Sequence, residues 1–146
     1  MSRKKKHTEL DYYGLYLLNY LKESHPDKAN DMALVEERAQ RAVNVYDQSF
    51  REGYPAAGAQ ELAMKSLLEG LHFSKYDLLR DVLESEFEGE LPGEEIPAFA
   101  RKLLPLLENV FSIYELTDDF AQSPEHDLLY TELTGAVALY LEEYGI

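Results

Sequence analysis

The residues best suited to chemistry in this chain are its four histidines and its many carboxylates. Glu69 and His72 have the Glu-x-x-His spacing that carboxylate-bridged di-metal bundles use. Such a site needs a second copy of the motif and two further glutamates on facing helices. His7, His25 and His126 have no acid three residues before them. We therefore expect no metal site, and a loop or capping role for His72.

Catalytic motifs of other kinds are also missing from the sequence. It has no cysteine, no Gly-x-Ser-x-Gly turn and no phosphate-binding loop with its lysine. Adjacent carboxylates are common in an acidic chain, and we interpret them as solvated helix faces or helix-start acids: Glu36-Glu37, Glu94-Glu95, Asp118-Asp119 and Glu142-Glu143. The sequence predicts no catalytic residues, no cofactor and no enzymatic activity.

Charge is distributed unevenly along the 146 residues, whose formal net charge is −14. Residues 81–146 hold sixteen Asp and Glu against Arg101 and Lys102, whereas residues 1–80 hold twelve of each sign. A strongly acidic body repels polyanions, so we expect no direct binding of nucleic acid. The same feature motivates one alternative, an acidic DNA mimic that occupies a nucleic-acid-binding protein.

Residues 1–8 form a basic head that includes Arg3, Lys4, Lys5 and Lys6. Such a head can touch nucleic-acid phosphates. The other residues, however, carry ten basic against 28 acidic side chains. We interpret residues 1–8 as a flexible, solubilising head and residues 9–146 as a single helical domain.

Apolar residues recur at helical spacing almost throughout, with no sustained alternation typical of strands. This pattern predicts an all-α, single-domain bundle of about six helices. Pro105 lies in the middle of the fifth helix, where it favours a kink or a restart. Cap, proline and glycine signals place the helix starts after Thr8, at Asp31, near Pro55, after Ser74, at Pro97 and after Ser123.

The first helix has apolar residues around most of its circumference. Tyr12, Tyr16 and Tyr20 form an i, i+4, i+8 stripe beside a second stripe of Leu10, Tyr13, Leu17 and Leu21. One core needs an apolar arc of only about 100°. Either this helix is central and wrapped by its neighbours, or its tyrosine face is offered to another protein or to a second copy of the chain.

Composition also indicates a compartment. A chain without cysteine suits a reducing environment, no apolar run approaches the roughly 18 residues that span a bilayer, and the N-terminus lacks the apolar core of a secretory signal. We expect a cytoplasmic protein with no membrane partner.

Several segments together resemble an uncharacterised family of small, wholly helical proteins from anaerobic gut and oral bacteria, often encoded on or near conjugative elements. The segments that carry the resemblance are ELDYY (9–13), LKESHP (21–26), GLHFSK (70–75), LTDDF (116–120), YTELTG (130–135) and LEEYGI (141–146). The resemblance implies a helical fold and a bacterial setting, and it brings no activity or catalytic residues with it.

Together these observations favour a non-enzymatic protein-interaction or regulatory accessory protein. Its expected partner is another protein or a second copy of itself as a homodimer. The expected interaction face is Tyr12, Tyr16 and Tyr20. The DNA mimic is the alternative, and an unrecognised enzyme is a remote one.

Overall fold

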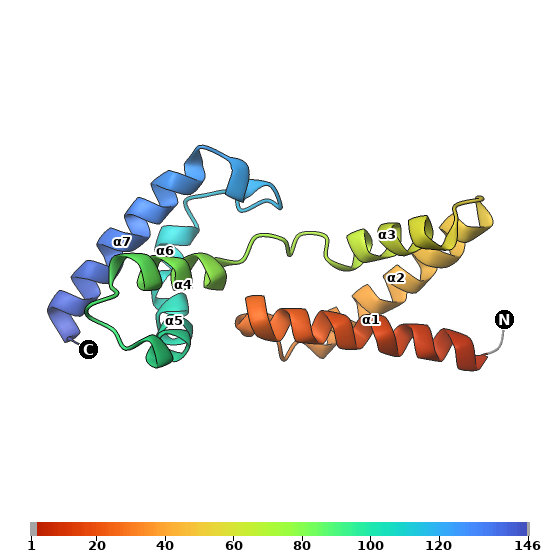
Figure 1. Cartoon of the computed structure of the whole chain (residues 1–146), viewed down its shortest axis with the longest axis horizontal. Coiled ribbons are helices and arrows are strands. Elements are labelled where there is room, and N and C mark those ends of the chain that lie inside the picture. Colours follow the sequence, from red (N-terminus) through yellow and green to blue (C-terminus); the bar gives the residue numbers. More distant parts are fainter. Residues whose placement is uncertain (1–2, 146) are drawn as a thin grey trace. The chain divides into compact units, whose positions relative to one another are not determined.

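A computed structural model of the chain describes the backbone of residues 3–145 and the side chains of residues 10–145. Over these residues the structure is built from α-helices and short 3-10 helices, with no strand (Figure 1). Six of the described helices have eight or more residues, and one further α-helix is a single turn. The predicted all-α fold of about six helices is confirmed.

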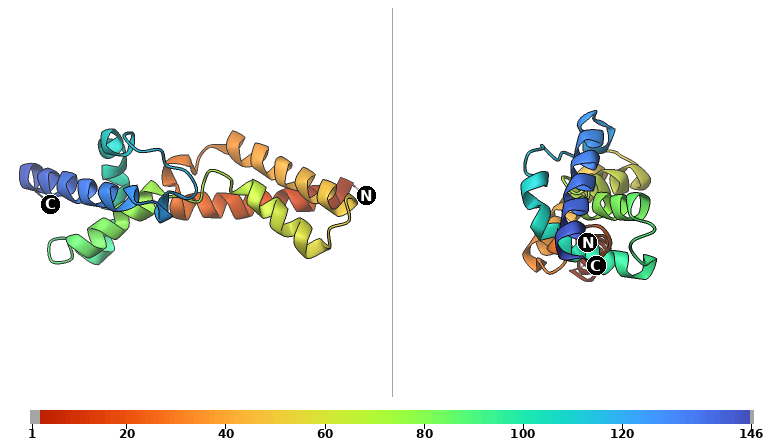
Figure 2. Two further views of the ribbon diagram at one scale, coloured as in Figure 1. Left: turned by 90° about the horizontal axis from the view of Figure 1, so that it is seen from above. Right: turned by 90° about the vertical axis from the view of Figure 1, so that its left-hand side faces the viewer.

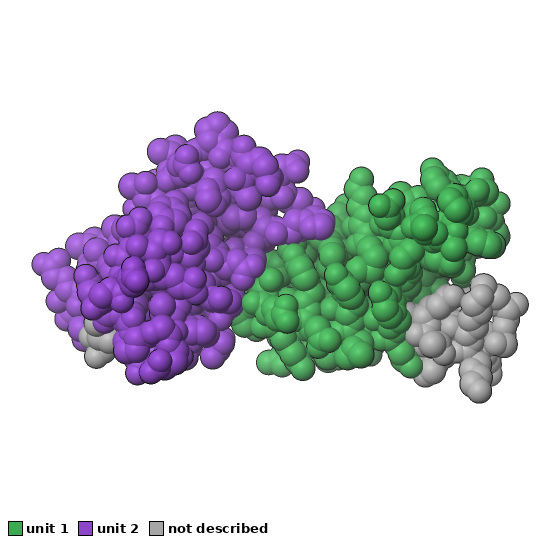
Figure 3. Space-filling model, viewed as in Figure 1, with its two compact units in different colours: residues 1–71 green, residues 72–146 purple. Residues whose placement is uncertain are grey.

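The helices form two compact units, residues 1–71 and residues 72–146 (Figure 3). Each unit has an apolar cluster of its own. The single helical domain expected over residues 9–146 therefore contains two cores.

Unit 1 consists of three helices: α1 (Arg3–Ser24), α2 (Met32–Arg51) and α3 (Ala56–Leu67). α2 packs against both α1 and α3, as the views in Figures 1 and 2 agree. The buried residues of this cluster are Tyr13, Leu17, Leu21, Val35, Ala39, Ala42, Val43, Ala63, Leu67 and Leu71. Alanines are frequent on α2 and α3, which allows these two helices to approach closely.

The ends of α2 follow local signals in the sequence. Asp31 is the N-cap, and its side chain accepts a hydrogen bond from the Leu34 N–H at 3.1 Å. The chain turns after the helix at Gly53, whose φ of +102° favours glycine. The predicted start at Asp31 is thus confirmed. Met32 and Phe50, which lie near the two ends of the helix, are both exposed.

The start of α1 differs from the expectation. The helix begins at Arg3, so the predicted N-cap at Thr8 is wrong. The backbone of the basic head is part of this helix from Arg3 onward. Its side chains lie outside the described residues, and its flexibility stays a prediction.

Unit 2 contains α4 (Lys75–Glu86), α5 (Ile96–Leu103), α6 (Glu108–Phe111) and α7 (Glu125–Tyr144), with 3-10 turns at Gly93–Glu95, Leu104–Leu107 and Phe120–Gln122. α4 contacts α5 and α7, and α6 contacts α7. The side chains that are fully buried at the centre of this cluster come from all four helices: Leu79, Val82, Leu83, Ala100, Leu103, Phe111, Leu129, Leu133 and Val137.

Pro105 has the predicted effect. α5 ends at Leu103, a 3-10 turn follows, and α6 restarts at Glu108. Ser74 caps α4 as expected, since its Oγ accepts a hydrogen bond from the Asp77 N–H at 2.9 Å. Ser123 does not cap α7. Its hydroxyl instead donates to the Phe120 carbonyl at 2.7 Å, within the preceding 3-10 turn.

The division into units coincides with the division of charge. Residues 1–71 hold 11 acidic and ten basic residues, a formal charge of −1. Residues 72–146 hold 17 acidic and four basic residues, a formal charge of −13. Among the described residues, no helix is both long and apolar enough to cross a membrane.

A candidate interaction surface on the first helix

One stripe of α1 provides its contact with the rest of unit 1. Tyr13, Leu17 and Leu21 are buried against α2 and α3. Burying a leucine side chain contributes about 1.5–3 kcal/mol, so Leu17 and Leu21 stabilise this contact. The Tyr13 hydroxyl also donates a hydrogen bond to Gln60 Oε1 on α3 at 2.6 Å. The described side chains of α1 that pack in this cluster therefore lie along one side of the helix.

Tyr20, the third member of the predicted interaction face, packs against the apolar cluster of unit 1. It is half-buried, and its hydroxyl donates to the Leu71 carbonyl at 2.8 Å. His25 Nε2 lies 2.7 Å from the same carbonyl, which can only accept, so Nε2 is a donor there. The two rings lie 5.8 Å apart. Tyr20 and His25 thus anchor the last residue of unit 1 to the end of α1.

Tyr12 and Tyr16 are exposed, as a docking face requires. The exposed fraction is 51% for Tyr12 and 41% for Tyr16, and their ring centroids lie 6.4 Å apart. Tyr12 also meets the buried Tyr13 ring edge-on at 5.3 Å. Tyr12 and Tyr16, two of the three predicted face residues, therefore form an exposed aromatic pair. The ring of Tyr12 also contacts the buried ring of Tyr13.

A groove that the sequence analysis did not foresee lies between α1 and α2. Its volume is about 640 Å³, and its lining is mainly apolar. The lining residues are Leu10, Asp11, Gly14, Leu15, Leu18, Met32, Val35, Glu36, Ala39 and Gln40. Leu15 is the most exposed of the apolar residues of α1, at 61%.

Gly14 leaves the floor of this groove open. A Cβ at this position would meet Val35 Cγ1 at 3.9 Å and Ala39 Cβ at 4.0 Å, which are ordinary contact distances. The packing of α1 on α2 therefore does not demand a glycine here. Glycine within a helix costs about 1 kcal/mol relative to alanine, so Gly14 keeps the groove floor open but makes α1 less stable than an alanine would.

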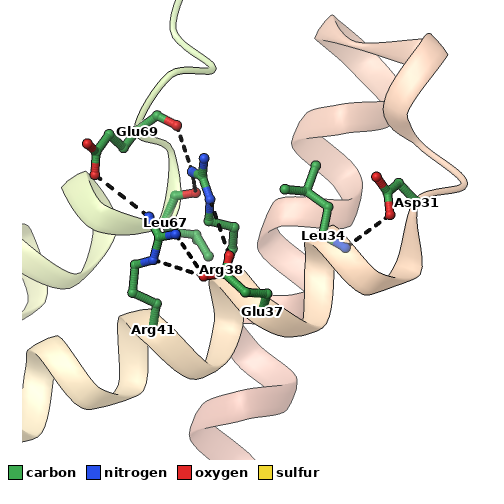
Figure 4. Close-up of polar contacts among 7 residues, drawn as sticks. All are labelled: Asp31, Leu34, Glu37, Arg38, Arg41, Leu67 and Glu69. Atoms are coloured by element: carbon green, nitrogen blue, oxygen red, sulfur yellow. Dashed lines mark hydrogen bonds and ion pairs between the residues drawn. The ribbon is translucent and has the colours of Figure 1, made fainter.

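Figure 4 shows the side chains that join α2 to the end of α3, together with the Asp31 cap of α2. Arg38 Nη1 donates to the carbonyls of Leu67 at 3.1 Å and Glu69 at 2.6 Å. These carbonyls lie at the C-terminal end of α3, where the helix supplies no partners of its own. Arg41 forms an ion pair with Glu37 at 2.7 Å and lies 3.8 Å from Glu69. The wall that α2 provides for the groove is thus held in place.

The histidines do not assemble a site in the described residues. The His72 N–H donates to Asp118 at 3.0 Å, and His126 Nδ1 lies 3.7 Å from Asp127. No group of three or more His, Asp or Glu within the part of the chain that the structure describes could hold a metal ion. Glu69 contributes its backbone carbonyl and its carboxylate to the contacts with α2 described above.

Comparison with known proteins places the chain among relatives. The family described as "Domain of unknown function (DUF1896)" matches residues 5–146. The chain belongs to this family. Its structure is similar to the crystal structure of protein PG0816 from Porphyromonas gingivalis, with a TM-score of 0.94 and 38% sequence identity over 98% of this chain and 97% of that one. No curated protein matches the chain.

The family assignment confirms the resemblance described above, including its link to an oral anaerobe. The DUF1896 match extends across both compact units. The description of the family names no activity.

Proposed function

We propose that this DUF1896 protein is a non-enzymatic interaction or regulatory accessory protein of the cytoplasm, which binds another protein through the exposed aromatic pair Tyr12 and Tyr16. A single observation carries the proposal. α1 already fills its core contacts with a separate stripe, yet it presents two large aromatic side chains to solvent.

The chemistry of tyrosine suits this role. A tyrosine ring buries a large apolar area, its hydroxyl stays hydrogen-bonded at an interface, and it has few side-chain torsions to immobilise. The Tyr12 ring contacts the buried Tyr13 ring edge-on, and this contact restricts the side-chain rotation of Tyr12 in the unbound protein. A preordered aromatic pair loses less conformational entropy on binding than two isolated rings.

The test is capture of a partner by the intact protein and by two single variants. Tyr16→Glu places a charge on the exposed aromatic pair, and we expect at least a tenfold loss of partner capture, because a buried unpaired charge is costly. Tyr54→Glu is the matched control, since Tyr54 is 48% exposed in the same unit and lies outside α1. Quantitative mass spectrometry of the captured proteins measures the loss.

Circular dichroism separates loss of binding from loss of fold. Tyr16 is exposed, so Tyr16→Glu should keep the helical spectrum of the unchanged protein. A protein retained equally by all three forms contradicts the proposal. Unfolding of Tyr16→Glu under conditions where Tyr54→Glu stays folded also contradicts it, because that result places Tyr16 in the core.

The charge of unit 2 favours a second candidate function, an acidic DNA mimic. Two of its four basic residues are engaged by acids of the same unit: Lys75 pairs with Glu108 at 3.1 Å and Arg80 with Glu84 at 3.4 Å. Little positive charge is therefore left to interrupt a negative surface. A nucleic-acid-binding protein is the partner that such a surface would suit.

The mimic makes a separate prediction about salt and competition. Binding of its partner should weaken steeply with added salt, and duplex DNA should displace it. Titrations of the captured partner at low and physiological ionic strength, with and without DNA, measure both effects. Salt-insensitive binding that DNA does not disturb excludes the mimic and leaves the tyrosine surface as the proposal.

A further inference from the structure

We propose that a second copy of this chain packs antiparallel against α1, along a stripe formed by Asp11, Leu15, Leu18 and Lys22, and covers the groove between α1 and α2. This goes beyond the proposed function, because it assigns a different flank of the helix to a different occupant.

The four residues form one continuous stripe. Their spacing of four, three and four residues places them within about 60° of the helix circumference, at 100° per residue. The stripe is centred about 130° from the centre of Tyr12, Tyr16 and Tyr20 on the same scale. Asp11, Leu15 and Leu18 also line the groove. The stripe and the tyrosine pair are therefore separate surfaces of one helix.

The order of the stripe is self-complementary. Read from either end it is a charge, a leucine, a leucine and a charge, and the two terminal charges have opposite signs. When two copies align antiparallel, Asp11 of each faces Lys22 of the other, and Leu15 of each faces Leu18. A two-fold contact requires such a self-complementary patch. A parallel alignment would set like charges against each other, which is unfavourable.

The shape of the surface also fits a second helix. Leu15 is 61% exposed and Leu18 is half-buried, so both have apolar area left to bury. Gly14 adjoins the stripe, and the missing side chain lets another helix approach the groove floor. Asp11 and Lys22 are both exposed at opposite ends of the stripe. The resulting contact pairs α1 and α2 of each copy in a four-helix arrangement.

Two charge reversals test the pairing. Asp11→Lys and Lys22→Glu each create two like-charge contacts in an antiparallel pair, and we expect each to weaken self-association by about tenfold or more. An equimolar mixture of the two variants should recover association. In the mixed pair, the new lysine faces the new glutamate, and the unchanged Lys22 faces the unchanged Asp11. Sedimentation equilibrium of the full chain over a range of concentrations measures all four cases.

A leucine pair supplies the matched control. Leu15→Ala removes apolar area from the stripe and should weaken self-association. Leu139→Ala removes a leucine that is 67% exposed on α7 and should leave it unchanged. Circular dichroism of each variant verifies the fold, which an exposed substitution should preserve.

Three results of these experiments would contradict the antiparallel pairing. A chain that stays monomeric at all concentrations overturns the inference, as does a dimer that neither charge reversal weakens or a mixture of variants that fails to recover. Tyr16→Glu lies off the stripe and should leave self-association intact. Failure of partner capture and failure of self-association can therefore be told apart.

Discussion

Tyr114 and Tyr130 of unit 2 both have a raised side-chain pKa. The hydrogen bond from the Tyr114 hydroxyl to Glu132 Oε1, at 2.6 Å, is the main cause that raises the pKa of Tyr114 from 10.0 to about 12. For Tyr130, burial is the main cause of the raised pKa, and the charges of Glu86 and Asp81 add to it. In both cases the surroundings disfavour the charged phenolate. Nearby carboxylates repel it and burial removes its hydration, so the pKa rises.

The Tyr114 shift predicts a pH dependence of stability. A pKa raised in the folded state means that the folded protein binds this proton more tightly than the unfolded chain. The contribution of Tyr114 is therefore fully present below pH 10 and is lost as the pH rises toward 12. Tyr114→Phe should remove that part of the alkaline loss of stability. Urea unfolding of both proteins at a series of alkaline pH values measures it.

Glu132→Gln is the matched variant for this prediction, because it keeps an acceptor for the hydroxyl and removes the charge. We expect the pKa of Tyr114 to fall toward its ordinary value in this variant. Ultraviolet titration of tyrosinate, compared with that of Tyr114→Phe, isolates the group. A titration of Tyr114 that does not respond to Glu132→Gln would contradict the assigned cause.

At the scale of elements, local sequence signals located helix boundaries when the signal had no competitor. Asp31 and Ser74 cap their helices as predicted, and Pro105 interrupts the fifth one. Each of these acts through bonds within four residues, which is the range that a sequence pattern can report. Such boundaries could be predicted with no knowledge of the tertiary structure.

Two residues predicted to cap helices, Ser123 and Thr8, do not act as caps. Ser123 has the ideal sequence for a cap, but its hydroxyl satisfies the Phe120 carbonyl of a 3-10 turn that the sequence analysis did not foresee. Thr8 does not cap α1 because this helix begins earlier, at Arg3. The bond of Ser123 to a nearby carbonyl is a known alternative to capping for short polar side chains.

The candidate surface was only partly predictable for a related reason. Helical periodicity showed that α1 is apolar on more than one side, and Tyr12 and Tyr16 are exposed as an interaction face requires. Periodicity could not show that Tyr20 has a backbone carbonyl as its partner, since that contact spans 51 residues. The groove needed α2 in place before Gly14 and Leu15 acquired any significance.

On the scale of the whole molecule, the two units differ strongly in formal charge, −1 for residues 1–71 against −13 for residues 72–146. The boundary escaped the sequence analysis because no polar linker marks it: Leu71, the last residue of unit 1, is buried in the cluster of that unit. The uneven distribution of charge was the sequence feature that indicated two different parts of the chain. The acidic half begins at residue 81, close to the boundary between residues 71 and 72.

This difference predicts that salt acts on one unit more than on the other. Like charges in unit 2, at a formal −13, repel one another and oppose compaction, whereas unit 1 is nearly neutral. Raising the ionic strength from about 0.01 M to about 0.15 M shortens the screening length from roughly 30 Å to roughly 8 Å. Amide hydrogen exchange in the intact chain should slow by about twofold or more in unit 2, with a smaller change in unit 1.

A neutral osmolyte at matched osmolality is the control, because it changes solvation without screening charge. Equal slowing in both units, or an equal response to the osmolyte, would contradict an electrostatic cause. Peptide-resolved mass spectrometry assigns the exchange to each unit without separating them.

The single guanidinium nitrogen that Arg38 shares between two carbonyls at the end of α3 has an evolutionary consequence. Arg38 Nε also lies 3.6 Å from Glu37 Oε2, so the guanidinium makes contacts through two nitrogens. Lysine has only one nitrogen and no planar fork, so the exchange is not conservative at this position. Relatives that carry another residue here need a different partner, such as water, for the carbonyls at the end of their third helix. Comparing that position with the length of the following turn across the family would show whether the two have changed together.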